Sequence, residues 1–222
     1  MGVGHAVLVA VAKVDAAEYG DDWSAGAEST VESAELVHAM LAARLTGRGA
    51  GNIHRLYTRA ATSTALQECV GGLGAGSEDL VVIYITCHGG YRTLCDRREQ
   101  ALYLHDRKLG LGELAALVRP LGCRCVVIAD ACHTGEPPLP SATARAMPDG
   151  GRGVLYFGAA VEATDGNLFT RLLTRLAPMA DDYRDLATRL QAALRASGGL
   201  QEPVFFADRA SGSFVGSKPF AV

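Results

Sequence analysis

Three short apolar segments constrain the fold of this chain more than any other feature of its sequence. Residues 6–12, 80–86 and 125–129 are almost continuously hydrophobic and rich in valine, isoleucine and leucine. Runs of this length and composition are typical of strands that are buried on both faces of a mostly parallel sheet. The sequence therefore predicts a central sheet that is covered by helices on both sides.

Helical periodicity alternates with these segments along the chain. Apolar residues recur at helical spacing in residues 29–45, 62–73, 111–117, 168–176 and 183–196. Weaker strand patterns cover residues 53–57, 153–158 and 203–206, which brings the expected sheet to about six strands. The alternation predicts one α/β domain over residues 1–222, and the polar segments 89–100 and 136–153 are expected to be loops.

Composition argues against several classes of function. The formal net charge is −3, from 21 basic and 24 acidic residues, so the chain lacks the basic excess of a nucleic-acid-binding protein. No apolar stretch approaches the roughly 20 residues that cross a bilayer, and no basic leader precedes residues 6–12. We therefore expect a cytoplasmic protein without nucleic-acid or membrane partners, whose six cysteines are reduced thiols.

Two of the predicted strands end in residues that can carry out chemistry. One ends in residues 86–89 (Thr-Cys-His-Gly) and the other in residues 130–132 (Asp-Ala-Cys). Ligands bind at the carboxyl ends of strands in an open parallel sheet, so His88 and Cys132 are expected to meet if the strands are neighbours. A thiol with its usual pKa of about 8.5 is mostly protonated at neutral pH, and an imidazole can take that proton. Backbone N–H groups at Gly89 and Cys132 can stabilise a developing oxyanion.

The carboxylate of Asp130 is expected beside this dyad. Asp130 lies two residues before Cys132, and alternation along a strand places both side chains on one face. Such a carboxylate can receive a cationic substrate side chain. Soft metal ligands also occur nearby, including Cys123 and Cys125, but none has the usual zinc spacing. We therefore expect neither a metal nor a cofactor.

The two strand-end motifs resemble those of caspase-like (clan CD) cysteine peptidases. A hydrophobic strand that ends in His-Gly precedes, by about 40 residues, one that ends in Asp-Ala-Cys-His-Thr-Gly, and the metacaspase or bacterial caspase-like branch is the most similar. The resemblance implies a three-layer sandwich with a mostly parallel sheet of about six strands. It also implies that His88 is the general base or acid, that Cys132 is the nucleophile, and that Gly89 and Cys132 form the oxyanion hole.

The resemblance further implies a substrate preference. Asp130 would line the pocket for the residue before the scissile bond (P1), and Thr86 stands where the family has a serine before His-Gly. A carboxylate there suits arginine or lysine at P1. Metacaspases usually carry a second acid in the first long helix, where this chain has Ser33. Their calcium-responsive acidic cluster is represented here only by sparse acids such as Asp96 and Asp106.

The expected function is therefore a cysteine endopeptidase that works through an acyl-enzyme on Cys132 and cleaves proteins or peptides after arginine or lysine. The family resemblance suggests a regulated role in bacterial stress, cell death or defence, with activation by a ligand, a partner protein or processing. Self-cleavage at Arg145 or Arg152 is a further hypothesis, because both lie in the expected loop 136–153. The alternative is a catalytically latent or inactive caspase-like module that binds a partner.

Overall fold

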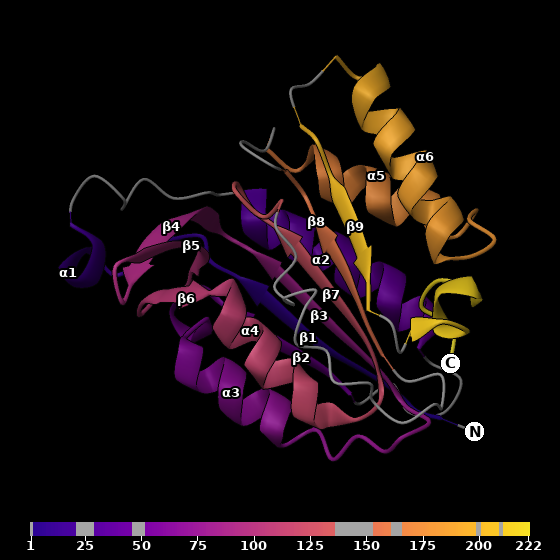
Figure 1. Ribbon diagram of the computed structural model, residues 1–222, viewed down its shortest axis with the longest axis horizontal. Helices are drawn as coiled ribbons and strands as arrows, with labels where there is room; N and C mark the ends of the chain where they lie inside the picture. The colour runs from indigo at the N-terminus through magenta and orange to yellow at the C-terminus, as the bar shows by residue number, and fades with distance from the viewer. Residues whose placement is uncertain are drawn as a thin grey trace.

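A six-stranded sheet forms the centre of the molecule (Figure 1). The structure is a computed structural model that describes residues 2–20, 29–45, 52–135, 153–160, 166–198, 201–208 and 211–222. The sheet order is β2-β1-β3-β7-β8-β9, in which only β9 runs antiparallel to its neighbour. The bounds of its strands are β1 Gly4–Ala10, β2 Ile53–Tyr57, β3 Leu80–Thr86, β7 Arg124–Asp130, β8 Gly153–Gly158 and β9 Val204–Ala207.

Burial of the strands explains the apolar runs of the sequence. Every residue of β1, β3 and β8 is buried, and so is every residue of β7 except Arg124. The edge strands β2 and β9 are only partly covered, which explains their weaker hydrophobic pattern.

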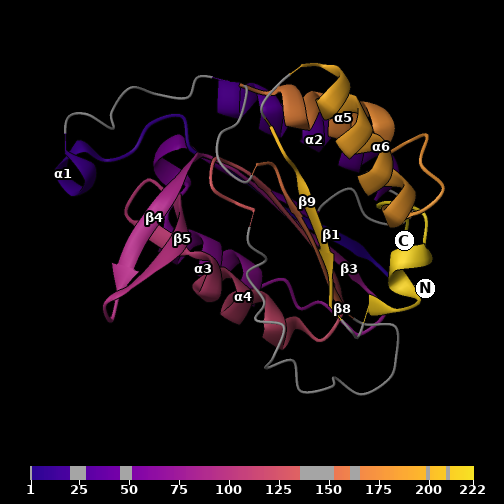
Figure 2. The same ribbon diagram turned by 45° about the horizontal axis from the view of Figure 1, so that its top comes forward.

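Helices cover both faces of this sheet, as Figures 1 and 2 show. One face packs against α2, α5 and α6, and the other against α3 and α4. The bounds of the helices are α1 Ala16–Tyr19, α2 Ser29–Arg44, α3 Ser63–Gly71, α4 Leu111–Val118, α5 Leu168–Leu176 and α6 Tyr183–Ala196, with short 3₁₀ helices η3 Thr58–Ala60, η4 Arg119–Leu121 and η6 Phe214–Gly216. The predicted three-layer α/β sandwich with six mostly parallel strands is therefore confirmed.

Two hydrophobic cores follow from the alternation of side chains along the strands. Val126 and Ile128 of β7 point toward the α2, α5 and α6 face, whereas Val127 and Ala129 point toward the α3 and α4 face. Asp130 continues the first set at the end of the strand, so its carboxylate lies on the α2 and α5 face of the sheet.

The segment 89–100 is not a loop, and the prediction for it was wrong. It belongs to a second sheet of three antiparallel strands, β4 His88–Leu94, β5 Arg97–Tyr103 and β6 Lys108–Gly110. Cys95 and Asp96 form the turn between β4 and β5, and both have positive φ, as the two-residue turns of hairpins require. The segment is polar because much of the hairpin is exposed, and that polarity hid the strand pattern.

An ion-pair network attaches this second sheet to α4. Arg92 of β4 contacts Glu99 of β5 at 3.3 Å and Glu113 of α4 at 2.5 Å. Arg107 also contacts Glu113, at 3.0 Å. The hairpin is thus anchored to the layer that covers the α3 and α4 face of the central sheet.

Two remaining expectations concern membranes and the segment 136–153. No helix in the described part of the chain is long and apolar enough to cross a membrane. Residues 136–152 lie outside the described residues, so the hypothesis of self-cleavage at Arg145 or Arg152 stays untested.

Candidate active site

The two strands that end in the predicted dyad are neighbours. β3 and β7 pair in parallel along their whole lengths, and Thr86 lies opposite Asp130 at their carboxyl ends. The chain continues from Thr86 through Cys87 to His88, which begins β4. It continues from Asp130 to Cys132, which lies in a turn. The sheet therefore delivers both residues to the same edge.

A backbone contact brings the two segments together. A Cβ atom built on Gly89 would overlap the carbonyl oxygen of Cys132 and lie 3.0 Å from its backbone nitrogen. Only glycine allows the strand after His88 to approach the nucleophile segment this closely. His88 and Cys132 are both half-buried, so each retains some access to solvent.

One step of the sequence argument needs correction. Strand alternation was expected to place Asp130 and Cys132 on one face, but β7 ends at Asp130 and Cys132 lies beyond the strand. The alternation rule therefore does not determine the direction of the Cys132 side chain. The turn that follows the strand does so instead.

Hydrogen bonds fix this turn. Thr134 is fully buried, and its hydroxyl donates to the carbonyl oxygens of Ala131 at 2.8 Å and Ala129 at 3.3 Å. Its N–H donates to the carbonyl oxygen of Ala160, and its own carbonyl oxygen accepts from the Tyr156 hydroxyl, both at 2.9 Å. The turn that carries Cys132 is thus attached to β7, to β8 and to the residues after β8.

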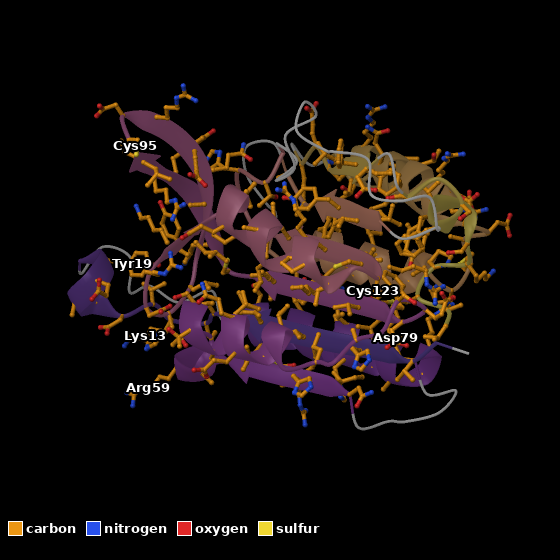
Figure 3. All side chains as sticks on the ribbon, turned by 60° about the horizontal axis from the view of Figure 1, so that its bottom comes forward. Lys13, Tyr19, Arg59, Asp79, Cys95 and Cys123 are labelled. Atoms are coloured by element: carbon orange, nitrogen blue, oxygen red, sulfur yellow. The ribbon has the colours of Figure 1, made fainter. Side chains whose placement is uncertain are left out.

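The environment of the cysteines distinguishes Cys132 from the buried thiols. Burial raises the pKa of Cys87 to about 12 and of Cys123 to about 11, and it raises the pKa of Cys125 well above its usual value. These thiols are therefore protonated and unreactive at neutral pH. Cys95 is exposed and lies in the turn between β4 and β5, at the end of the molecule opposite Cys123 in Figure 3. Cys132 combines partial exposure with closeness to the His88 segment.

A buried polar cluster surrounds Asp130. Its oxygen Oδ2 accepts a hydrogen bond of 2.6 Å from the hydroxyl of Thr170 in α5 and one of 3.3 Å from the hydroxyl of Tyr84 in β3. The hydroxyls of Tyr84 and Thr170 are themselves 2.6 Å apart. The other oxygen, Oδ1, is buried and has no hydrogen-bond partner among the residues that the structure describes. Burial raises the pKa of Asp130 to about 6, although both hydroxyls oppose that shift.

Thr86 and Ser33 complete this cluster. Both are buried, with 3% and 1% of their surfaces exposed. Burial raises the pKa of Tyr84 above its usual value, the charge of Asp130 adds to that shift, and hydroxyls including those of Thr86 and Ser33 oppose it. Ser33 thus lies beside the same tyrosine as Asp130 does.

Sequence reasoning missed Tyr84 and Thr170. Tyr84 precedes Thr86 by two residues, so strand alternation already placed both on the face of Asp130. That signal could have identified the tyrosine. Nothing in the sequence indicated Thr170, because it comes from a helix 40 residues further along the chain.

Metal-binding groups do not converge at this edge. Within the described ranges, no three histidine, cysteine, aspartate or glutamate side chains lie close enough together to hold an ion. Two of the sparse acids near the hairpin have structural partners. Glu99 pairs with Arg92, and Asp106 accepts hydrogen bonds from the backbone and hydroxyl of Ser63.

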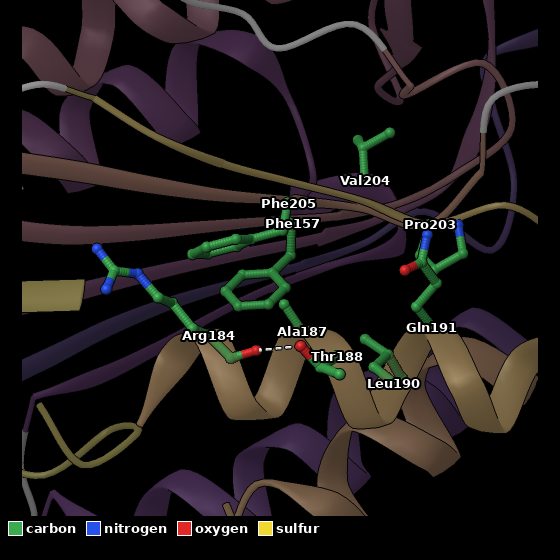
Figure 4. A pocket seen from close by; sticks show the side chains of 9 residues that line it. All are labelled: Phe157, Arg184, Ala187, Thr188, Leu190, Gln191, Pro203, Val204 and Phe205. Carbon is green, nitrogen blue, oxygen red and sulfur yellow. Dashed lines mark hydrogen bonds between the residues drawn. The ribbon is translucent and has the colours of Figure 1, made fainter. Parts of the chain in front are cut away.

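A groove between α6 and β9 offers no chemistry of its own. It has a volume of about 290 Å³, and Phe157 and Phe205 line it beside the α6 residues Arg184 and Thr188 (Figure 4). Among the described residues that line it, none is a cysteine, a histidine or a carboxylate. It is therefore not a candidate for the catalytic centre.

Comparisons with solved structures define the class of fold. The chain is similar to protein GSU0716 from Geobacter sulfurreducens, with a TM-score of 0.76, 21% identity and 99% of each chain covered. It is also similar to the Drosophila initiator caspase Dronc, with a TM-score of 0.60, 10% identity, and 98% of this chain and 82% of Dronc covered. No protein-family model and no curated protein matches the sequence. The chain therefore has a caspase-like fold.

Proposed function

We propose that this protein is a cysteine endopeptidase whose dyad is His88 and Cys132. One observation carries the proposal: the backbone of Gly89, the residue after His88, lies directly against the backbone of Cys132 at the ends of two paired strands. An imidazole and a half-exposed thiol on segments in contact are the parts that covalent catalysis by cysteine requires. The caspase-like fold supports a hydrolase, and the chemistry is assigned from the residues.

The proposed reaction has two steps. The Cys132 thiolate attacks the carbonyl carbon of the scissile peptide bond while the proton of the thiol resides on His88. The N–H groups of Gly89 and Cys132 stabilise the negative oxygen of the tetrahedral intermediate. His88 protonates the leaving amine, the C–N bond breaks and a thioester remains. His88 then accepts a proton from water, which attacks the thioester and releases the acid and the thiol.

The proposed substrate is a protein or peptide with arginine or lysine at P1. Asp130 supplies a negative charge on the α2 and α5 face of the same sheet edge, and its Oδ1 atom has no protein partner among the described residues. A guanidinium or ammonium group beside it would lower its pKa from about 6 and keep it ionised at neutral pH. Thr86 and Ser33 would line the same pocket.

The test is cleavage of fluorogenic peptides that differ only at P1, with Cys132→Ala as the inactive control and with calcium present or absent. Turnover after arginine or lysine that disappears in the Cys132→Ala variant would support both the dyad and the role of Asp130. Turnover that survives this substitution would refute the assignment of the nucleophile. Turnover after aspartate alone would refute the assigned preference.

A second candidate function is a latent caspase-like module that needs a ligand or partner protein. The burial of Asp130 favours this candidate, because only 4% of the residue is exposed. The residues packed around Asp130 must move before a P1 side chain can contact it. A regulated cytoplasmic role in bacterial stress, cell death or defence is consistent with such latency and is part of the proposal. Turnover by the protein alone, without any added component, would argue against this candidate.

A further inference from the structure

Strand β4 makes two contacts with residues 131–134, which we call the nucleophile turn. Gly89 and Tyr91 lie on the same face of β4 because they are two residues apart. Gly89 lies against the backbone of Cys132, and the ring of Tyr91 lies against the ring of His133, the next residue of the turn. The ring centroids are 4.9 Å apart at an angle of 45°, a common arrangement of paired aromatic rings.

A third side chain joins this pair from β5. The guanidinium carbon of Arg98 lies 3.7 Å from the centroid of the Tyr91 ring, a cation–π contact. Tyr91 pairs with Gln100 across the ladder, so Arg98 is its diagonal neighbour on the same face of the hairpin. We call Arg98, Tyr91 and His133 the hairpin stack.

His133 has a conformation that needs support. Its φ is 53°, in the left-handed region that side chains other than glycine rarely adopt. Its Nδ1 atom is buried and has no hydrogen-bond partner within the described ranges. Residues with such strain persist only where their surroundings hold them, and they cluster at active sites. The Tyr91 ring is the aromatic contact of His133 that the structure describes.

We propose that Tyr91 is a positioning residue for Cys132: by stacking on His133 it holds the nucleophile turn against Gly89. This inference rests on the proposed function. The stack fixes the backbone of the residue after the nucleophile, and Gly89 meets the backbone of the nucleophile itself. Together they determine how the Cys132 thiol and N–H face the segment that carries His88. The role of Arg98 is to hold the Tyr91 ring in its place.

The first test compares Tyr91→Ala with Tyr91→Phe. Phenylalanine keeps the ring and alanine removes it, so the phenylalanine variant should retain kcat within about twofold and the alanine variant should lose about 10- to 100-fold, with KM nearly unchanged. Thr93→Ala is the matched control, because Thr93 lies on the same face of β4 two residues further along and is exposed. An alanine variant with normal kcat would overturn the inference, and so would a phenylalanine variant as slow as alanine.

A second variant removes the other partner. His133→Asn keeps a residue that tolerates left-handed φ and deletes the ring. Because the two rings act as one unit, His133→Asn should reproduce the loss of the Tyr91→Ala variant, and the double variant should be no slower than either single variant. Losses that multiply in the double variant would refute the shared role. If the Tyr91→Ala protein fails to fold, the kcat of the His133→Asn variant alone tests the inference.

A measurement without substrate separates this inference from the proposed function. Alkylation of Cys132 by iodoacetamide at neutral pH, followed by mass spectrometry, reports the thiolate fraction whether or not any peptide is cleaved. The rate should fall about tenfold in the Tyr91→Ala variant and stay unchanged in the Thr93→Ala variant. If wild type cleaves nothing but this difference holds, the proposed function fails and the positioning role stands. If wild type cleaves peptides and the difference is absent, the positioning role fails alone.

Discussion

Replacement of Asp130 by asparagine should change how the stability of this protein depends on pH. Asp130 is almost completely buried, and two hydroxyls bind only one of its carboxylate oxygens. Burial therefore disfavours its charged form and raises its pKa from 3.8 to about 6. Asparagine has nearly the same shape and no charge, so it removes the titration and leaves the packing in place.

The size and sign of the effect follow from this pKa. Between about pH 4 and pH 6 the folded protein holds a proton on Asp130 that the unfolded chain has already released, so the free energy of unfolding falls as the pH rises. A shift of about two pKa units corresponds to about 3 kcal/mol. The stability of the Asp130→Asn variant relative to wild type should therefore rise by about 3 kcal/mol over this range.

Urea denaturation at a series of pH values measures this difference. Asp79→Asn is the control, because the pKa of Asp79 is shifted in the opposite direction. Burial acts to raise the pKa of Asp79, but hydrogen bonds from the N–H groups of Val3 and Gly76 and from His5 outweigh it and hold the pKa below its usual value. Because the pKa of Asp79 lies below 3.8, that variant should lose stability relative to wild type as the pH rises to about 4, and its curve should run parallel to that of wild type at higher pH. Parallel curves for wild type and Asp130→Asn would refute the account of Asp130 as a buried, half-satisfied acid.

Two further substitutions test the geometry around the dyad. Gly89→Ala should lower turnover about 100-fold, because its Cβ collides with the backbone of Cys132, and should lower the free energy of unfolding by about 1–3 kcal/mol; peptide cleavage and urea denaturation measure both, and near-normal turnover would contradict the contact. Thr170→Val removes the shorter hydrogen bond to Asp130 and should destabilise the protein by about 2 kcal/mol at pH 7. Thr174→Val, whose hydroxyl bonds only backbone carbonyls of α5, is the matched control, and equal losses would contradict the role given to Thr170.

The central sheet could be read from the sequence because burial on both faces leaves a continuous apolar run. The strands β3 and β7 are buried at nearly every position, and their hydrophobic segments were visible without any tertiary information. Two helices were predicted with the bounds that the structure gives, Leu168–Leu176 and Tyr183–Ala196, because their apolar residues recur at helical spacing. The approach of the segment after His88 to the backbone of Cys132 was expected from the neighbouring ends of the same two strands.

Other features depend on contacts that no local pattern records. The hairpin of β4 and β5 was taken for a loop because exposed strands carry charges, and its turn at Cys95 and Asp96 lacks the usual glycine. The hydroxyls of Tyr84 and Thr170 contact each other although the two residues are 86 positions apart in the sequence. The packing of α5 on the sheet brings them together. Thr170 could not be predicted as a partner of Asp130 for the same reason.

The most direct test of the central claim is covalent labelling with a peptide that ends in arginine and carries a thiol-reactive group in place of the scissile bond. The account predicts one adduct, located on Cys132 by peptide mapping, and a much slower reaction with the matched peptide that ends in aspartate. Replacement of His88 by alanine should slow the labelling strongly, because the imidazole takes the proton of the thiol. Adducts on the half-buried Cys69 or the exposed Cys95 instead, or equal rates for the two peptides, would contradict the proposed dyad and its arginine preference.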